Sequence, residues 1–115
     1  MTGERRPMKE ESLTIDAVTR IVSGSDDESI QIVRRDKNEE FMYENNITES
    51  DAKNFVRSLT RQDLVDGPVE DYDPNRKHPL WIFKKFGFMH QCYIKLKIIN
   101  KNRIVIVVSL HEDEQ

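Results

Sequence analysis

Three side chains near the C-terminus, Tyr93, Lys95 and His111, have the types and the spacing that phosphate chemistry needs. Tyr93 and Lys95 stand two residues apart in an apolar run, so they share one face if that run is a β-strand. His111 can act as an acid or a base near neutral pH. A phenol, an ammonium and an imidazole on one rigid surface suit an anionic substrate. We therefore take these three as candidate catalytic residues, although the same pattern also occurs on ordinary solvated strand faces.

RNA cleavage is one reaction that such a set can perform without a metal, because the ribose 2'-hydroxyl attacks its own phosphate. The enzyme then supplies a base, an acid for the leaving 5'-oxygen, and cations for the crowded phosphate. Lys95 would offset the phosphate charge, and Tyr93 would position the phosphate or donate a proton. The candidates for binding neighbouring phosphates are Lys84, Lys85, Lys97 and Arg76. No metal and no cofactor is expected, since a two-metal centre needs carboxylates that this part of the chain lacks.

The charge is divided unevenly along the chain, and the net charge of -3 conceals this. From Pro74 to Leu110 there are eight Lys and Arg residues and no Asp or Glu, whereas residues 1–73 carry ten basic and eighteen acidic side chains. Charge asymmetry between two halves is a pointer to nucleic-acid contact. We expect the surroundings of Tyr93 and Lys95 to be free of acids.

The elements that would hold these residues change in period along the chain. After residue 80 the period is two, which predicts strands over 80–86, 90–98 and 103–111, joined as an antiparallel meander. The last of these is apolar on both faces, which suggests a central strand. Upstream, the pattern predicts helices over 14–22, 36–46 and 48–59, one turn at 60–63, a strand or helix lead-in at 29–33, and a long loop over 65–79. Helices followed by strands predict an α+β fold, with N-terminal helices packed on a C-terminal antiparallel sheet of three or more strands.

The length of 115 residues supports one domain. We expect a disordered tail over 1–11, a single α+β domain over 12–111 and an acidic C-terminal tail over 112–115. No apolar run approaches the roughly 20 residues that a membrane span needs, and no signal peptide is evident. These features favour a cytoplasmic protein without a membrane partner. Cys92 is the only cysteine, which leaves no intrachain disulfide and no Cys-based zinc site.

Strand parity predicts which side chains meet. In the strand 90–98, Cys92 and the apolar residues Ile94, Leu96 and Ile98 face the core, and Tyr93 and Lys95 face away. A three-residue connection with Asn102 in the left-handed conformation would set Tyr93 opposite Ser109 and Lys95 opposite Val107. The last strand would then bury Ile104, Ile106, Val108 and Leu110. Tyr93, Lys95, Ser109 and His111 would form one polar patch.

The remaining aromatic and histidine residues have simpler interpretations. For the aromatic side chains near the first strand, packing in the core or at its edge is favoured over base stacking; they are Trp81, Phe83, Phe86 and Phe88. Exposure in a loop or at an edge is the default for His78 and His90. Cys92 is expected to be a small buried hydrophobe rather than a nucleophile.

The order of several short motifs resembles one known family. The motifs are Leu59-Thr60-Arg61-Gln62-Asp63, Leu80-Trp81-Ile82-Phe83, Tyr93-Ile94-Lys95-Leu96 and Val107-Val108-Ser109-Leu110-His111. In their order, spacing and place near the chain end they resemble the MqsR family of type II toxin–antitoxin toxins, which share the RelE-like fold of bacterial mRNA interferases. The likeness covers roughly residues 30–111, and specific residues match over about thirty positions.

The resemblance implies a metal-independent, sequence-selective mRNA endoribonuclease that a cognate antitoxin protein holds inactive. Tyr93 falls on the active-site tyrosine of the family, Lys95 on the lysine two residues along, and His111 on a basic position after the terminal strand. Two other interpretations stay open. The basic sheet is either a non-catalytic module that binds nucleic acid or an acidic protein, or a surface that meets the acidic half of another copy.

Overall fold

The computed structural model describes residues 13–71 and 78–114, which contain three α-helices and one five-stranded sheet. The elements in chain order are α1 (Ile15–Ser23), the 3-10 helix η3 (Asp27–Ser29), β1 (Ile30–Ile32), α2 (Asp36–Glu44), α3 (Glu49–Arg57), the 3-10 helix η4 (Arg61–Asp63), β2 (Leu64–Val69), β3 (Leu80–Gly87), β4 (His90–Ile99) and β5 (Ile104–Glu112). The predicted α+β class is confirmed. The predicted tail over 1–11 and the candidate residue Arg76 lie outside the described residues. Among the helices that are described, none is long and apolar enough to cross a membrane.

The sheet has the strand order β1-β5-β4-β3-β2. The meander of β3, β4 and β5 is antiparallel, as the sequence predicts, and β5 is an interior strand. The expectation of a wholly antiparallel sheet is wrong, because β1 pairs with β5 in parallel. A parallel pair needs a long connection between its strands, and here α2, α3 and the hairpins fill that connection.

The edge strand β2 lies where the sequence predicts only a loop. The Gly67-Pro68 dipeptide is typical of a turn and interrupts the alternation that marks a strand, and Gly67 has a φ of 135°. The pairing of β2 with β3 also shifts register on either side of Asp66. An edge strand needs ladder hydrogen bonds on one side only, so it tolerates a proline. That tolerance is the reason why the loop prediction fails at residues 65–69.

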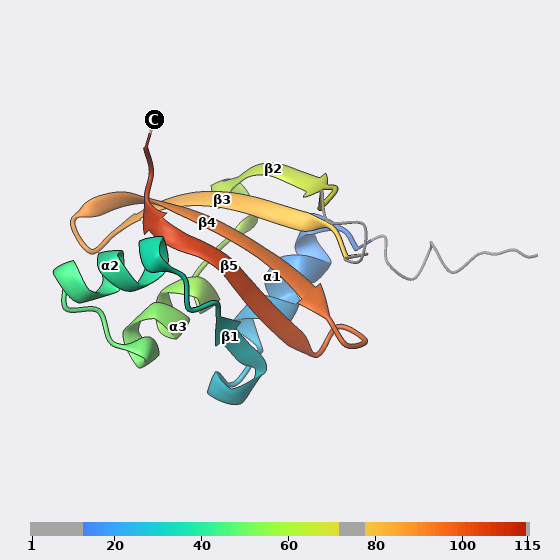
Figure 1. Ribbon diagram of the computed structural model, residues 1–115. Helices are drawn as coiled ribbons and strands as arrows, with labels where there is room; N and C mark the ends of the chain where they lie inside the picture. The colour runs from blue at the N-terminus through green and yellow to red at the C-terminus, as the bar shows by residue number, and fades with distance from the viewer. Residues whose placement is uncertain (1–12, 72–77, 115) are drawn as a thin grey trace, which may run out of the picture.

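The core lies between one face of the sheet and the helices, which Figure 1 shows below the sheet. The Thr14 and Thr48 side chains cap α1 and α3, and Thr48 and Asp51 form a full capping box. The side chains that α1 and α3 bury most deeply are apolar and spaced at helical intervals: Val18, Val22, Ala52 and Val56. They pack in one cluster with the predicted inner face of β4, which is Cys92, Ile94, Leu96 and Ile98.

The other face of the sheet, which we call the open face, carries Ile82, Lys84 and Phe86 of β3, Tyr93 and Lys95 of β4, and Ser109 and His111 of β5. Cross-strand pairs fix this set, because residues that are directly opposite in an antiparallel pair project to the same side. Tyr93, Lys95 and His111 are each partly exposed. The open face therefore contains the predicted polar patch.

The register of β4 and β5 differs from the prediction at both ends of the pair. Asn100, Lys101 and Asn102 are all left-handed, with φ values of 56°, 57° and 67°. Within the turn, the Arg103 amide donates to the Ile99 carbonyl at 3.1 Å. The strand pairing begins one residue later, with Ile99 opposite Ile104 rather than opposite Arg103 as predicted. Asn102 is left-handed as expected, but three successive left-handed residues make the connection one residue longer.

A β-bulge then corrects the parity of β5. Leu96 pairs with Val107 and Lys95 pairs with Ser109, which leaves Val108 as an extra residue. Before the bulge, Val105 and Val107 are fully buried, and beyond it Leu110 is fully buried. The prediction that Ile104, Ile106 and Val108 face the core is wrong, because each of them is only partly buried.

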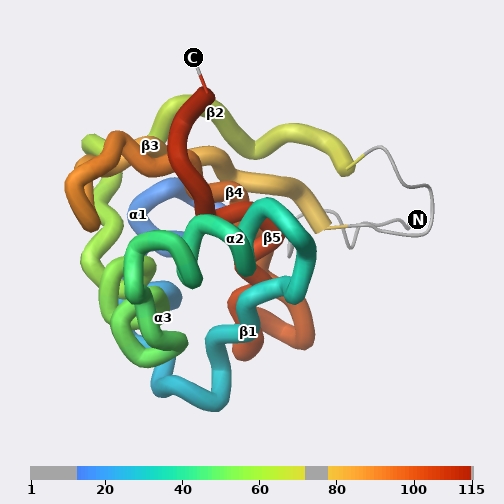
Figure 2. Tube along the Cα trace, turned by 60° about the vertical axis from the view of Figure 1, so that its left-hand side comes forward, coloured from blue at the N-terminus to red at the C-terminus, as the bar shows by residue number. Residues whose placement is uncertain are grey.

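Asn38, in the first turn of α2, holds the bulge in place. Its Nδ2 donates to the Val33 carbonyl at 2.9 Å and to the Val108 carbonyl at 3.1 Å, and its Oδ1 accepts from the Leu110 amide at 2.9 Å. The side chain is fully buried. Figure 2 shows α2 beside this end of β5. The amide replaces the strand pairing that stops where β1 ends.

Replacing Asn38 by Ala is expected to lower the free energy of unfolding by about 2–4 kcal/mol, because each buried backbone group left without a partner costs roughly 1–3 kcal/mol. Urea unfolding followed by circular dichroism measures the loss. Asn54→Ala, on the exposed side of α3, is the matched control and should change stability little. Equal midpoints for the two variants would show that the Asn38 amide does not hold the bulge.

Candidate functional site

Tyr93 and His111 lie side by side at the centre of the candidate site. They are directly paired across β4 and β5. Their rings are stacked, with centroids 5.4 Å apart and planes 21° from parallel. The sequence predicts both residues on one face, but it pairs Tyr93 with Ser109. The one-residue bulge and the longer turn together bring His111 opposite Tyr93.

One hydrogen bond fixes the proton on the His111 ring. His111 Nδ1 donates to the carbonyl oxygen of Glu112 at 3.0 Å, because a carbonyl oxygen only accepts. In the neutral imidazole the lone pair is then on Nε2. A ring held in this form can take a proton at Nε2 from a substrate hydroxyl.

Arg35 adds a cation that is not among the residues predicted from the sequence. It precedes α2, and its Nη1 lies 3.4 Å from Ser109 Oγ and 3.5 Å from the Val108 carbonyl. Ser109 is buried and directly opposite Lys95, so the Arg35 guanidinium contacts the cross-strand partner of Lys95. Charge counting missed Arg35 because this residue belongs to the acidic half of the chain. The only signal in the sequence is the Arg34-Arg35 pair at the start of a predicted helix.

The structure separates the three described lysines that were predicted to bind phosphates. Lys84 is opposite Tyr93 on the open face, and its Nζ lies 3.0 Å from Asp113 Oδ2. Lys85 is opposite Cys92 on the core side of the sheet and lies 3.8 Å from Asp63. Lys97 is nearly buried, at 8% exposed, and lies 3.3 Å from Asp71. Of the described lysines named here as candidates, Lys84 and Lys95 are those that the strand pairing places next to Tyr93 on the open face.

The expectation that the surroundings of Tyr93 and Lys95 are free of acids is wrong. β5 continues to Glu112, and the Asp113 amide donates to the Gln91 carbonyl at 2.8 Å, which brings the Asp113 carboxylate beside Lys84. The next residue, Glu114, pairs with Lys37 of α2 at 2.8 Å. The hydrogen bond from Lys37 is the largest cause that lowers the pKa of the Glu114 carboxyl. The three C-terminal acids therefore contact the structured domain.

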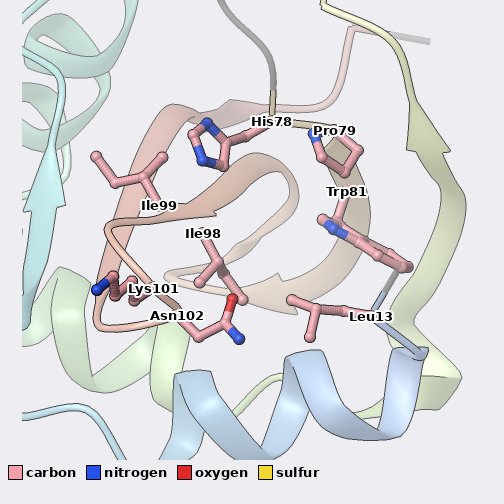
Figure 3. A pocket seen from close by; sticks show the side chains of 8 residues that line it. All are labelled: Leu13, His78, Pro79, Trp81, Ile98, Ile99, Lys101 and Asn102. Atoms are coloured by element: carbon pink, nitrogen blue, oxygen red, sulfur yellow. The ribbon is translucent and has the colours of Figure 1, made fainter. Parts of the chain in front are cut away.

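The two other histidines lie away from the stacked rings. His90 Nε2 lies 3.0 Å from Asn45 Oδ1 and its Nδ1 lies 3.5 Å from Glu112, with the ring against Phe41. His78 lines a pocket of about 410 Å³ at the far end of β4, together with Leu13, Pro79, Trp81, Ile98, Ile99, Lys101 and Asn102. Figure 3 shows His78 and Lys101 at this pocket with Trp81 and Ile98. It includes none of the candidate catalytic residues.

Within residues 13–71 and 78–114, no group of three or more His, Cys, Asp or Glu is arranged to hold a metal ion. No protein-family model matches the chain, and neither do any curated proteins or solved structures.

Cys92, on the core side of the strand that carries Tyr93, should behave as an inert thiol. Burial, followed by the charge of Glu112, raises its pKa to about 11 from 9.0. Between pH 9 and 11 the unfolded chain loses this proton and the folded chain keeps it, so the free energy of unfolding should fall as the pH rises. Cys92→Ala should flatten that fall.

Thiol titration with a disulfide reagent gives a second measurement. At pH 8 the folded protein should react far more slowly than the urea-unfolded chain. Equal rates would mean that Cys92 is accessible in the folded protein.

Proposed function

We propose that this chain is a metal-independent endoribonuclease of the RelE-like kind and the toxin of a type II toxin–antitoxin pair. The observation that carries the proposal is the stacked pair of Tyr93 and His111, with Lys95 on the same face and Arg35 in contact with Ser109, the cross-strand partner of Lys95. The pair offers two groups that can transfer protons, and we expect the two cations to meet one phosphate. The order of motifs that resembles the MqsR family supports the choice of RNA as substrate.

The proposed reaction uses the substrate's own 2'-hydroxyl. His111 Nε2 takes the hydroxyl proton as the 2'-oxygen attacks phosphorus, and the bond from phosphorus to the 5'-oxygen breaks. Tyr93 gives its phenolic proton to the leaving 5'-oxygen. The products are a 2',3'-cyclic phosphate and a 5'-hydroxyl end, and the proton on His111 later returns to Tyr93 through water. Lys95 and Arg35 stabilise the charge that develops on the phosphate.

Purified protein should cleave single-stranded RNA in the presence of EDTA. Tyr93→Phe and His111→Ala should each lower the rate by about 10²–10⁴-fold, the usual contribution of a general acid or base. Lys95→Gln should also slow cleavage. Lys85→Gln is the matched control, since it removes a lysine charge from the opposite face of the same sheet. Gel separation of end-labelled RNA measures the rates, and a terminal-phosphate assay identifies the cyclic product.

If both the Tyr93→Phe and the His111→Ala variants still cleave RNA, the assignment of the catalytic site is wrong. Salt-sensitive RNA binding without any product, even at high protein concentration, would instead support the non-catalytic nucleic-acid module.

Expression in bacterial cells tests the toxin role separately. The protein is expected to act in the cytoplasm, where the mRNA substrate is found, so its induction should arrest cell growth. A chain that carries both Tyr93→Phe and His111→Ala should not arrest growth. Colony counts after induction, with equal protein levels on a blot, measure the effect. Unchanged growth with active enzyme would contradict the toxin role and leave the nuclease proposal standing. A cognate antitoxin is expected to restore growth when it is co-expressed.

A further inference from the structure

One aromatic side chain on the open face is left in solvent. Phe86 is 66% exposed and lies outside the hydrophobic core. The other aromatic side chains of this hairpin are packed: Trp81 and Phe83 are almost fully buried, and the Phe88 ring lies 4.9 Å from that of Phe55. Core packing, one of the two kinds of packing that the sequence favours over base stacking, therefore does not account for Phe86.

The register places Phe86 next to the candidate site. It lies two residues along β3 from Lys84, which is directly opposite Tyr93. Its own partner on β4 is Gln91, so Phe86 and Tyr93 are diagonal neighbours on the same face. Diagonal neighbours of an antiparallel pair are roughly 7–8 Å apart, within reach of aromatic side chains.

We propose that Phe86 is a stacking platform for the base of a nucleotide that flanks the phosphate at Tyr93 and His111. This inference rests on the proposed function and names its substrate class as single-stranded RNA. Bases within a duplex are already stacked and cannot lie on a side chain, whereas single strands present their faces to exposed aromatic rings. A platform of this kind accepts any base and does not select the sequence. It favours single strands, and it aligns the RNA strand relative to Tyr93 and His111.

The charges around the ring fit a nucleic acid better than an apolar protein segment. Lys84 and Lys95 lie on the Tyr93 side of Phe86, and Arg35 lies beyond Lys95. The one carboxylate of the described residues that pairs with Lys84 is that of Asp113. A phosphate near Lys84 would have to compete with Asp113, so the strand is expected to place its phosphate nearer Lys95 and its base over Phe86.

Binding is measured by fluorescence anisotropy with the full chain and a labelled 12-nucleotide RNA whose 2'-hydroxyls are all methylated. Methylation blocks the attacking group, so binding is separated from cleavage. Phe86→Ala should weaken binding by roughly tenfold or more, which corresponds to the loss of one stacked base. Phe86→Trp should restore it. Tyr43→Ala is the matched control, because Tyr43 is an exposed aromatic residue on α2.

Two further measurements separate the alternatives. The Phe86→Trp fluorescence should be quenched by the single-stranded RNA and not by the duplex of the same sequence. Equal affinity of wild type and Phe86→Ala would overturn the inference, as would a change in self-association without a change in RNA binding. If binding depends on Phe86 but unmodified RNA is not cleaved, the stacking role of Phe86 would be supported and the proposed endoribonuclease activity would be contradicted.

Discussion

The geometry of the open face depends on the hydrogen bonds of the Asn38 amide. By bonding to the Val108 carbonyl and the Leu110 amide, it holds the bulge where β1 has already ended. The bulge reverses the parity of β5, so Leu110 enters the core and His111 emerges opposite Tyr93. Without that reversal, the last residues of β5 would present an apolar side chain to Tyr93. A buried amide of the helical half thus decides which residue of β5 meets Tyr93.

This dependence explains what the sequence can and cannot predict. The inner and outer faces of β4 follow from alternation within one strand, and the cap Thr48 follows from Asp51 three residues away. The polar patch of Tyr93, Lys95, Ser109 and His111 is also found. Its pairings are wrong, because two changes of register have no local signal: three left-handed residues in one turn, and a bulge that needs an amide 70 residues upstream. Arg35 is missed for the same reason.

Charge along the chain is a poor guide to charge in space. Three lysines of the basic half, Lys84, Lys85 and Lys97, each pair with an acid that lies outside it in sequence. Such partly buried pairs contribute to holding β2 and the C-terminal residues against the sheet, and they leave little net field. Among the described residues, no acid lies within ion-pair distance of Lys95. Arg35, which contacts the cross-strand partner of Lys95, comes from the acidic half, so the charge at the site comes from both halves.

The two ends of the open face consequently differ in the work that a ligand must do. At Lys84 an incoming anion has to displace the Asp113 carboxylate, which is only 13% exposed in the pair. Beside Lys95, Arg35 is already aimed at Ser109, and no described carboxylate has to leave. The free-energy cost of binding a phosphate is therefore expected to be lower on the β5 side of Tyr93. The apolar ring of Phe86 makes the β3 side suited to a base. This difference between the two ends would orient a single-stranded RNA across β3, β4 and β5 independently of its sequence. Its phosphate would then approach Tyr93 and His111 from one direction.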